Sequence, residues 1–170
     1  MNFWDERFNS AEFIYGIEPN EFVKEYLGKD SNNNQRVLFV CEGEGRNSVY
    51  SAKLGHDVYA FDSSVVGRQK ALDLAQKNNL PLNYIISDAR EIKYNNNFFD
   101  KIFLIYAHFP PEFRESVHRN LVKYLKKDGE IIIEAFNPKQ LNYNSGGPKN
   151  IDMLYTESIL RSDFIDLEII

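Results

Sequence analysis

The sequence predicts a doubly wound α/β fold, in which a mostly parallel sheet carries helices on both faces. From residue 37 onward, strand-like and helix-like segments alternate in a regular order, which is the pattern of βαβ units. The turn after the first strand-like segment contains Gly43 and Gly45 and leads directly into a helix-like segment. A chain of 170 residues suits one core, so we expect a single domain over residues 1–170.

The N-terminal segment, residues 1–29, is rich in aromatic residues and ends in a predicted helix. Pro19 lies near the first turn of this helix, apolar residues follow at helical spacing, and Gly28 marks its end. A polar loop over residues 30–35 comes next. Five strands are then predicted at residues 37–41, 58–61, 83–86, 101–106 and 130–135. Three amphipathic helices are predicted at residues 46–54, 65–78 and 111–125. Residues 137–150 form a loop that is long enough to serve a function.

Composition disfavours several classes of protein. With 20 basic and 25 acidic residues the net charge is −5, which gives no overall attraction to nucleic acid or anionic lipid. No apolar run approaches the ~20 residues of a membrane span, and no signal peptide begins the chain, so we expect a cytoplasmic protein. A single cysteine and three histidines offer no zinc-ligand spacing, and we expect no metal site.

The turn after the first strand is the first candidate site, because open α/β sheets bind ligands beyond the carboxyl ends of their strands. Gly43 and Gly45 allow a sharp bend and a close approach to a ligand, and the next helix presents free N–H groups there. A tight turn without any ligand is the alternative reading. The turn consists of Cys41, Glu42, Gly43, Glu44, Gly45, Arg46 and Asn47.

Two further acids follow neighbouring strands. Asp62, with Ser63 beside it, comes directly after the second strand, where a carboxylate can accept both hydroxyls of a ribose. A helix-capping role for Asp62 is the alternative, although Ser63 or Ser64 can cap the helix alone. Asp88 follows the third strand and is placed to meet an adenine amino group, or else is a solvated loop acid.

The acids in the glycine turn bear on the kind of cofactor. Glu42 and Glu44 would repel the pyrophosphate of a nicotinamide dinucleotide, which disfavours an oxidoreductase. A sulfonium cofactor has no phosphate and carries a positive centre and an amino group. The acidic turn therefore favours a sulfonium cofactor.

Taken together, these residues resemble the class I S-adenosylmethionine-dependent methyltransferases, in particular the group related to tellurite-resistance and thiopurine methyltransferases. The resemblance covers nearly the whole chain, and it is the combination of motifs that makes it specific. The motifs are Trp4-Asp5-Glu6-Arg7-Phe8, Tyr15-Gly16-x-Glu18-Pro19-Asn20, residues 37–47, Leu54-Gly55-His56-Asp57-Val58, Phe61-Asp62, Ser87-Asp88-Ala89, Phe99-Asp100-Lys101-Ile102 and Leu125-Lys126-Lys127-Asp128-Gly129.

The resemblance implies S-adenosylmethionine as cofactor and S-adenosylhomocysteine as product. It places the cofactor in a cradle at residues 41–45, with Asp62 on the ribose and Asp88 and Ala89 near the adenine. Tyr106, Ala107 and His108 then lie at the mouth that faces the methyl group. The N-terminal aromatic segment would fold over the cofactor as a lid, or else its aromatic residues anchor the first helix.

The chain departs from the family pattern in two places. Where the family has an acid and a glycine, this chain has Phe39 and Cys41, and we expect Glu42 to take over the contact with the methionine amino group. Cys41 itself fits a small buried thiol better than a nucleophile. The printed sequence also ends where the sixth strand of the family would begin, so we expect the sheet to lack the family's last one or two strands. The resulting open edge could pair with a second copy as a homodimer.

His108 and Tyr106 are the catalytic candidates. Methyl transfer is an in-line displacement in which the protein mainly positions the acceptor, so a base is optional. His108 follows the fourth strand and would suit proton removal, or it only bonds the backbone beside the Pro-Pro helix start. Tyr106 would contact cofactor or substrate, or merely end the strand. The sequence thus predicts methyl transfer to an oxygen, nitrogen, sulfur or metalloid atom of a small molecule, with a non-catalytic S-adenosylmethionine-binding protein as the alternative.

Overall fold

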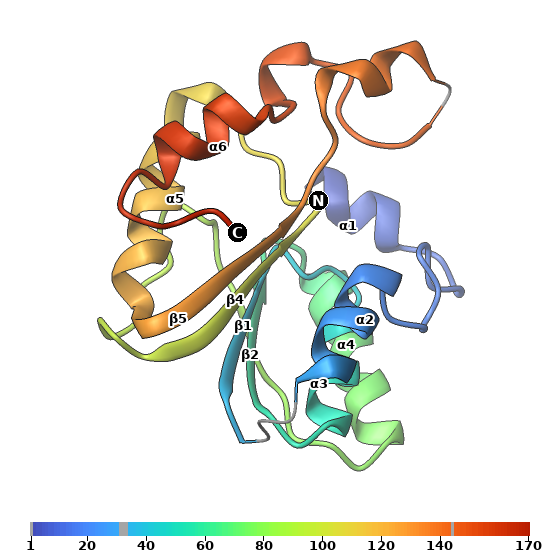
Figure 1. Ribbon diagram of the computed structural model, residues 1–170. Coiled ribbons are helices and arrows are strands. Elements are labelled where there is room, and N and C mark those ends of the chain that lie inside the picture. The colour runs from blue at the N-terminus through green and yellow to red at the C-terminus, as the bar shows by residue number, and fades with distance from the viewer. Residues whose placement is uncertain (1, 31–33, 144) are drawn as a thin grey trace.

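Five parallel strands form one sheet in the order β3-β2-β1-β4-β5 (Figure 1), as the computed structural model shows. The structure describes residues 2–30, 34–143 and 145–170. The strands are β1 (Arg36–Val40), β2 (Asp57–Asp62), β3 (Asn83–Ile86), β4 (Phe99–Ile105) and β5 (Leu125–Glu134). The α-helices are α1 (Phe3–Phe8), α2 (Glu21–Lys29), α3 (Arg46–Lys53), α4 (Val65–Lys77), α5 (Pro111–Tyr124) and α6 (Glu157–Asp163), and the 3₁₀ helices are η1 (Pro138–Asn142) and η2 (Ile151–Met153). The predicted doubly wound α/β architecture is confirmed.

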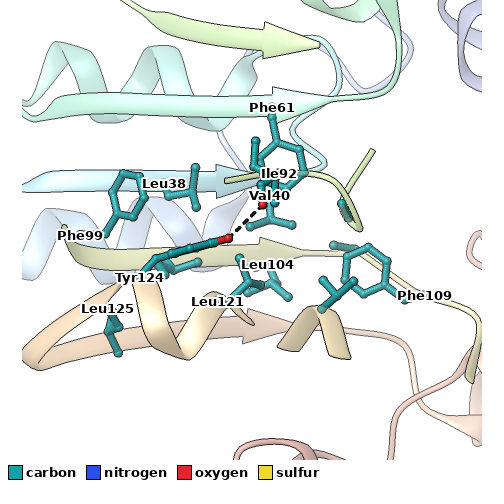
Figure 2. Close-up of a cluster of buried hydrophobic side chains, with 14 residues drawn as sticks. Leu38, Val40, Phe61, Ile92, Phe99, Leu104, Phe109, Leu121, Tyr124 and Leu125 are labelled. Carbon is teal, nitrogen blue, oxygen red and sulfur yellow. Dashed lines mark hydrogen bonds between the residues drawn. The ribbon is translucent and has the colours of Figure 1, made fainter. Parts of the chain in front are cut away.

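Helices cover both faces of the sheet because successive residues of each central strand point to opposite sides. Val37 and Phe39 pack in the cluster that contains α2, α3 and α4, whereas Leu38 and Val40 pack in the cluster that contains α5. Figure 2 shows the second cluster, in which the Tyr124 hydroxyl donates a hydrogen bond of 2.9 Å to a backbone oxygen. The continuous burial of β1 after its first residue follows from this two-sided cover.

Two predicted boundaries are wrong. Asn20 caps α2 through its side-chain oxygen, so Pro19 precedes the helix, and the helix continues through Gly28. The fifth strand begins at Leu125, directly after α5, and not at residue 130. Its first residues are accommodated by a shift of register against β4, with Asp128 at a φ of 62°. Residues 126–129, which lie between the predicted helix and the predicted strand, are therefore an irregular part of the strand.

The segments after β5 are only partly irregular. Part of the predicted loop over residues 137–150 is the 3₁₀ helix η1, and α6 packs against α5. Residues 31–33 and Asn144, which the sequence places in loops, lie outside the described residues. Within the described part of the chain, the outer edges of β3 and β5 have no strand partner, and pairing of two copies through such an edge stays a prediction. No described helix is long and apolar enough to cross a membrane.

Candidate functional site

The site lies at the carboxyl edge of the sheet, at the point where the chain order reverses between β1 and β4. Cys41 and Tyr106 directly follow these two strands, and both have positive φ values, 53° and 56°. Residues other than glycine rarely adopt this conformation, which costs on the order of 1–3 kcal/mol and occurs preferentially at functional sites. The switch point is also where open α/β sheets bind their ligands, so the two observations indicate the same edge.

The glycine turn is held by close packing. The backbone needs glycine at Gly43 and Gly45, whose φ values are 65° and 89°. A Cβ at Gly45 would lie 2.5 Å from the Cβ of Ala71 on α4, and one at Gly43 would lie 3.0 Å from the ring of Phe8. The Tyr84 hydroxyl donates a 2.7 Å hydrogen bond to the Gly43 carbonyl. The turn is therefore fixed from α1, β3 and α4 together.

Glu42 lies beneath the first turn of α3. Its Oε1 accepts hydrogen bonds from the backbone N–H groups of Asn47 and Ser48, at 2.9 Å and 2.7 Å. Burial raises the pKa of Glu42 to about 7, although these two N–H groups favour the charged form. The Ser48 hydroxyl also favours the charged form, and the carboxylate retains acceptor capacity for a donor such as an ammonium group.

Asp62 joins the ends of β1 and β2. Its Oδ2 accepts from the Gly43 N–H at 3.0 Å and its Oδ1 from the Ser64 N–H at 2.9 Å. Burial raises the pKa of this carboxyl. The Ser63 N–H also favours the charged form, so of the about four acceptor positions of an ionised carboxylate about one remains for a ribose hydroxyl. Ser64, and not Ser63, caps α4, while the Ser63 carbonyl accepts from the side chain of Asn2.

Three predicted residues of the turn point toward the N-terminal segment instead. The carboxylate of Glu44 forms a 2.6 Å ion pair with Lys70 of α4 and accepts from the backbone N–H of residue 14 at 2.8 Å. Arg46 donates to the carbonyl of Tyr15 at 3.2 Å, and the Asn47 side chain accepts from the backbone N–H of residue 20 at 2.9 Å. These contacts anchor residues 14–20, and a direct role in cofactor binding stays a prediction.

The N-terminal segment covers the turn. Phe8 of α1 is buried against Gly43, and Trp4 stacks on it with 5.4 Å between ring centroids. The carboxylate of Asp5 accepts from the Ser64 hydroxyl at 2.7 Å and from a backbone N–H at the start of α4 at 3.2 Å. These contacts anchor α1 to the turn and to α4, and a lid role for the segment stays a prediction.

The residues after β3 are less engaged. Asp88 pairs with Arg90 at 2.7 Å, and the hydrogen bond from Arg90 lowers the pKa of its carboxyl. Ala89 is buried in the cluster on the α5 side of the sheet. Their proximity to an adenine stays a prediction. Phe39, which stands where the family has an acid, is buried and stacks on Phe103, so it cannot reach a ligand.

Tyr106 and Ala107 lie where β4 ends. The Tyr106 hydroxyl donates to Oε1 of Glu134 at 3.0 Å, and its ring stacks on Phe136 with centroids 4.6 Å apart. The ring is 39% exposed, so a ligand can reach it. Ala107 is buried, and its carbonyl accepts from the Tyr155 hydroxyl at 3.1 Å.

Both ring nitrogens of His108 are occupied by backbone groups. Nδ1 lies 2.7 Å from the Met153 carbonyl, and Nε2 lies 3.1 Å from the backbone N–H of Phe136. The carbonyl requires a proton on Nδ1 and the N–H requires a lone pair on Nε2, so the ring is the neutral Nδ1–H tautomer. Burial lowers its pKa, which agrees with this state. In this conformation His108 has no free nitrogen for proton transfer.

The sequence analysis did not single out Glu134 as a site residue. It ends β5, next to the end of β4, and its Oε2 accepts from the side chain of Asn20 at 2.6 Å. The available signal was an acid at the carboxyl end of a predicted strand, which is the same signal that marked Asp62. The contact with Asn20 joins residues 114 positions apart, so no local pattern reveals it.

The fold and the acids at its carboxyl edge define the class I S-adenosylmethionine-dependent methyltransferases. Residues 37–129 match the methyltransferase domain family, and because this match spans more than half of the chain, the chain belongs to that family. The cofactor of the class is S-adenosylmethionine. The residues present fit it, since the carboxylates of Asp62 and Glu42 lie at this edge and retain acceptor capacity for a ribose hydroxyl and an ammonium group.

Known proteins with similar sequences are tRNA (uracil(54)-C(5))-methyltransferases. That of Pyrococcus furiosus is 28% identical over 156 residues, which is 84% of this chain and 36% of the relative. That of Pyrococcus abyssi is 29% identical over 153 residues, 79% of this chain and 36% of the relative. The chain thus spans about a third of the length of these curated relatives.

Solved structures confirm the fold. The PH0226 protein of Pyrococcus horikoshii is 26% identical, with a TM-score of 0.65 over 79% of this chain and 63% of that one. A SAM-dependent methyltransferase of Aquifex aeolicus has a TM-score of 0.75 at 19% identity, over 97% and 88% of the two chains. TehB of Haemophilus influenzae has a TM-score of 0.69 at 20% identity, over 96% and 54%.

Proposed function

We propose that this protein transfers the methyl group of S-adenosylmethionine to a small-molecule acceptor. The observation that carries the proposal is the row of carboxylates at the carboxyl edge, with Glu42 after β1 and Asp62 at the end of β2, at the switch point of a methyltransferase fold. When bound, the cofactor supplies a methyl group on a positively charged sulfur. An acidic site suits such a ligand, because the ligand is positively charged and has no phosphate for the acids to repel.

The site residues would have separate roles along the carboxyl edge of the sheet. The Asp62 carboxylate would hold the ribose, and the Glu42 carboxylate would hold the ammonium group. Asp88 would meet the adenine beyond the end of β3. Tyr106, with Ala107, would form the wall at the methyl end. Because methyl transfer depends mainly on orientation, we assign His108 to positioning this wall, and not to proton transfer.

A small acceptor is favoured over RNA by charge. The net charge of −5 gives no long-range attraction to a phosphate backbone, which supplies most non-specific nucleic-acid binding. The curated relatives act on tRNA, but the chain matches only about a third of their length. Unmodified tRNA therefore belongs in the acceptor screen as a competing substrate.

The test starts with binding. Thermal unfolding is followed with S-adenosylhomocysteine and, in parallel, with NADH, and ligand at 100 times its dissociation constant should add ~2.7 kcal/mol of stability. We expect stabilisation by S-adenosylhomocysteine alone, and at least a tenfold weaker affinity for the Glu42→Gln variant. Transfer of a radiolabelled methyl group to small acceptors then separates an enzyme from a silent binder. Stabilisation by NADH alone, or preferred labelling of tRNA, contradicts the proposal.

A further inference from the structure

Glu134 and Tyr106 form a fixed pair at the ends of β5 and β4. The Tyr106 hydroxyl donates to Oε1 at 3.0 Å, and the Asn20 amide donates to Oε2 at 2.6 Å. The amide is itself oriented, because the Asn20 side-chain oxygen caps α2 by accepting from the N–H of Val23 at 3.1 Å. Donors from two other elements therefore hold the carboxylate in one orientation, which is what a binding group needs.

The position of this pair follows from the order of the strands. In the proposed function, adenine, ribose and methionine follow one another along the ends of β3, β2 and β1. The next strands in the sheet are β4 and β5. The methyl group then faces the ends of these two strands, and an acceptor approaching it must pass Tyr106 and Glu134. This placement of the methyl group and the acceptor rests on the proposed function.

The chemistry of the pair restricts the acceptor. Each oxygen of Glu134 accepts one hydrogen bond in the structure, so each retains a further acceptor position. Burial and the neighbouring Glu134 raise the pKa of Tyr106, so the phenol remains a donor to the carboxylate. The Tyr106 ring is 39% exposed and stacks on Phe136, which provides an aromatic surface beside the carboxylate. The nearby Arg46 donates to the Tyr15 carbonyl.

We propose that Glu134 binds the methyl acceptor, and that the acceptor is an aromatic amine without an anionic group. The ring packs against Tyr106, and the N–H group donates to the Glu134 carboxylate. An acceptor that carries its own carboxylate is repelled there, since like charges in a partly buried site disfavour one another. Glu134 thus selects the acceptor, in addition to orienting it.

The same carboxylate takes the proton that the reaction releases. The lone pair of the acceptor nitrogen forms the new bond to the methyl carbon, and the carbon–sulfur bond breaks with its electron pair remaining on sulfur. The nitrogen then carries a positive charge and passes its N–H proton to Glu134, from which it reaches solvent.

The test compares two probes, aniline and 4-aminobenzoate, which share the amine and differ in one carboxylate. The wild-type protein and the Glu134→Gln variant are saturated with S-adenosylhomocysteine, and probe binding is measured by NMR titration. Methyl transfer to each probe is measured with labelled cofactor. Glu115→Gln is the matched control, because it removes the same charge from an exposed ion pair on α5.

We expect wild type and Glu115→Gln to prefer aniline at least tenfold, in affinity and in kcat/KM. Glu134→Gln should bind S-adenosylhomocysteine within twofold of wild type, lose at least 100-fold in methylation of aniline, and discriminate less than threefold between the probes. Unchanged discrimination in Glu134→Gln, a preference for 4-aminobenzoate, or no binding of either probe to the saturated wild-type protein overturns the inference. Failure of wild type to bind S-adenosylhomocysteine overturns the proposed function itself, and is seen in the first titration.

Discussion

Lys70 of α4 and Glu44 of the glycine turn form a buried ion pair, with 2.6 Å between Nζ and Oε1. The side chains are 15% and 4% exposed. Lys70 also donates to the carbonyl of Glu12 at 2.8 Å, and Glu44 accepts from the N–H of Ile14. One pair therefore fastens the glycine turn, α4 and the N-terminal segment to one another, although the two residues are 26 positions apart.

Removing both members of this pair should cost less than the sum of the two single losses. Glu44→Gln or Lys70→Met leaves a buried charge without its partner, which costs about 3–5 kcal/mol. The double variant leaves no such charge, so we expect its loss to be at least ~1 kcal/mol smaller than the sum of the two single losses. Urea unfolding of the four proteins checks this, and strictly additive losses would show that the pair is not coupled.

Glu42 should make stability depend on pH. Burial raises the pKa of Glu42 from an ordinary value of 4.5 to about 7 in the folded protein. Between these two pH values the folded state keeps a proton that the unfolded chain has released. The contribution of this carboxyl to stability is therefore complete below about pH 4.5 and is lost as the pH rises through about 7.

Glu42→Gln removes that dependence because glutamine does not titrate. From pH 4.5 to 7 we expect the stability of wild type, relative to Glu42→Gln, to fall by up to about 3 kcal/mol. Urea unfolding at intervals of half a pH unit measures this, with Glu115→Gln as an exposed control. If the stability of wild type and of Glu42→Gln changed in parallel with pH, the Glu42 carboxyl would titrate alike in the folded and unfolded states.

Substitutions at Gly45 and Gly55 distinguish the cost of a positive φ from the cost of a steric overlap. Their φ values are nearly equal, 89° and 91°, but a Cβ at Gly45 meets Ala71 at 2.5 Å, whereas one at Gly55 meets nothing within 4 Å. Gly55→Ala should cost about 1–2 kcal/mol for the backbone conformation alone. Gly45→Ala should cost a further 1–3 kcal/mol or so for overpacking. Thermal unfolding of both variants checks the difference, and equal losses would refute a role for the Ala71 contact.

Tyr155 fixes the segment that follows β4. Its hydroxyl accepts from the Phe109 N–H at 2.9 Å and donates to the Ala107 carbonyl at 3.1 Å. Both backbone groups are buried, so Tyr155→Phe leaves two unsatisfied groups at about 1–3 kcal/mol each. We expect a loss of about 2–4 kcal/mol on this basis in denaturant unfolding. Tyr143→Phe, at a 68% exposed position, should stay within ~0.5 kcal/mol of wild type. An equally small loss for Tyr155→Phe would contradict a stabilising role for its two hydrogen bonds to the backbone.

The periodic elements could be predicted from the sequence because their signals are local. Alternation of apolar residues reflects which faces are buried, and the α3 and α4 boundaries predicted from it lie within one residue of those observed. The fifth strand was misplaced because its first residues pair with β4 through an irregular register, which depends on the partner strand and not on local propensity. The helix predicted to end at Gly28 ends one residue later, at Lys29.

The site could be predicted in position but only partly in its contacts. Asp62 ends a buried strand and the glycine turn follows another, and chain order alone places the ends of parallel strands at one edge. The direction of each side chain there depends on what packs against it. Glu42 turns under α3, and Glu44 turns toward Lys70, although the two acids look equivalent in the sequence.

The sequence by itself determined the fold class, the family and the edge of the sheet that carries the site. Only the tertiary structure decided that both nitrogens of His108 bond the backbone and that Glu134 meets Tyr106 and Asn20. The physical reason is the range of the interactions. Hydrophobic periodicity is a pattern among residues close together in the sequence. A hydrogen bond between residues 20 and 134 forms only after the whole sheet has brought the two side chains together.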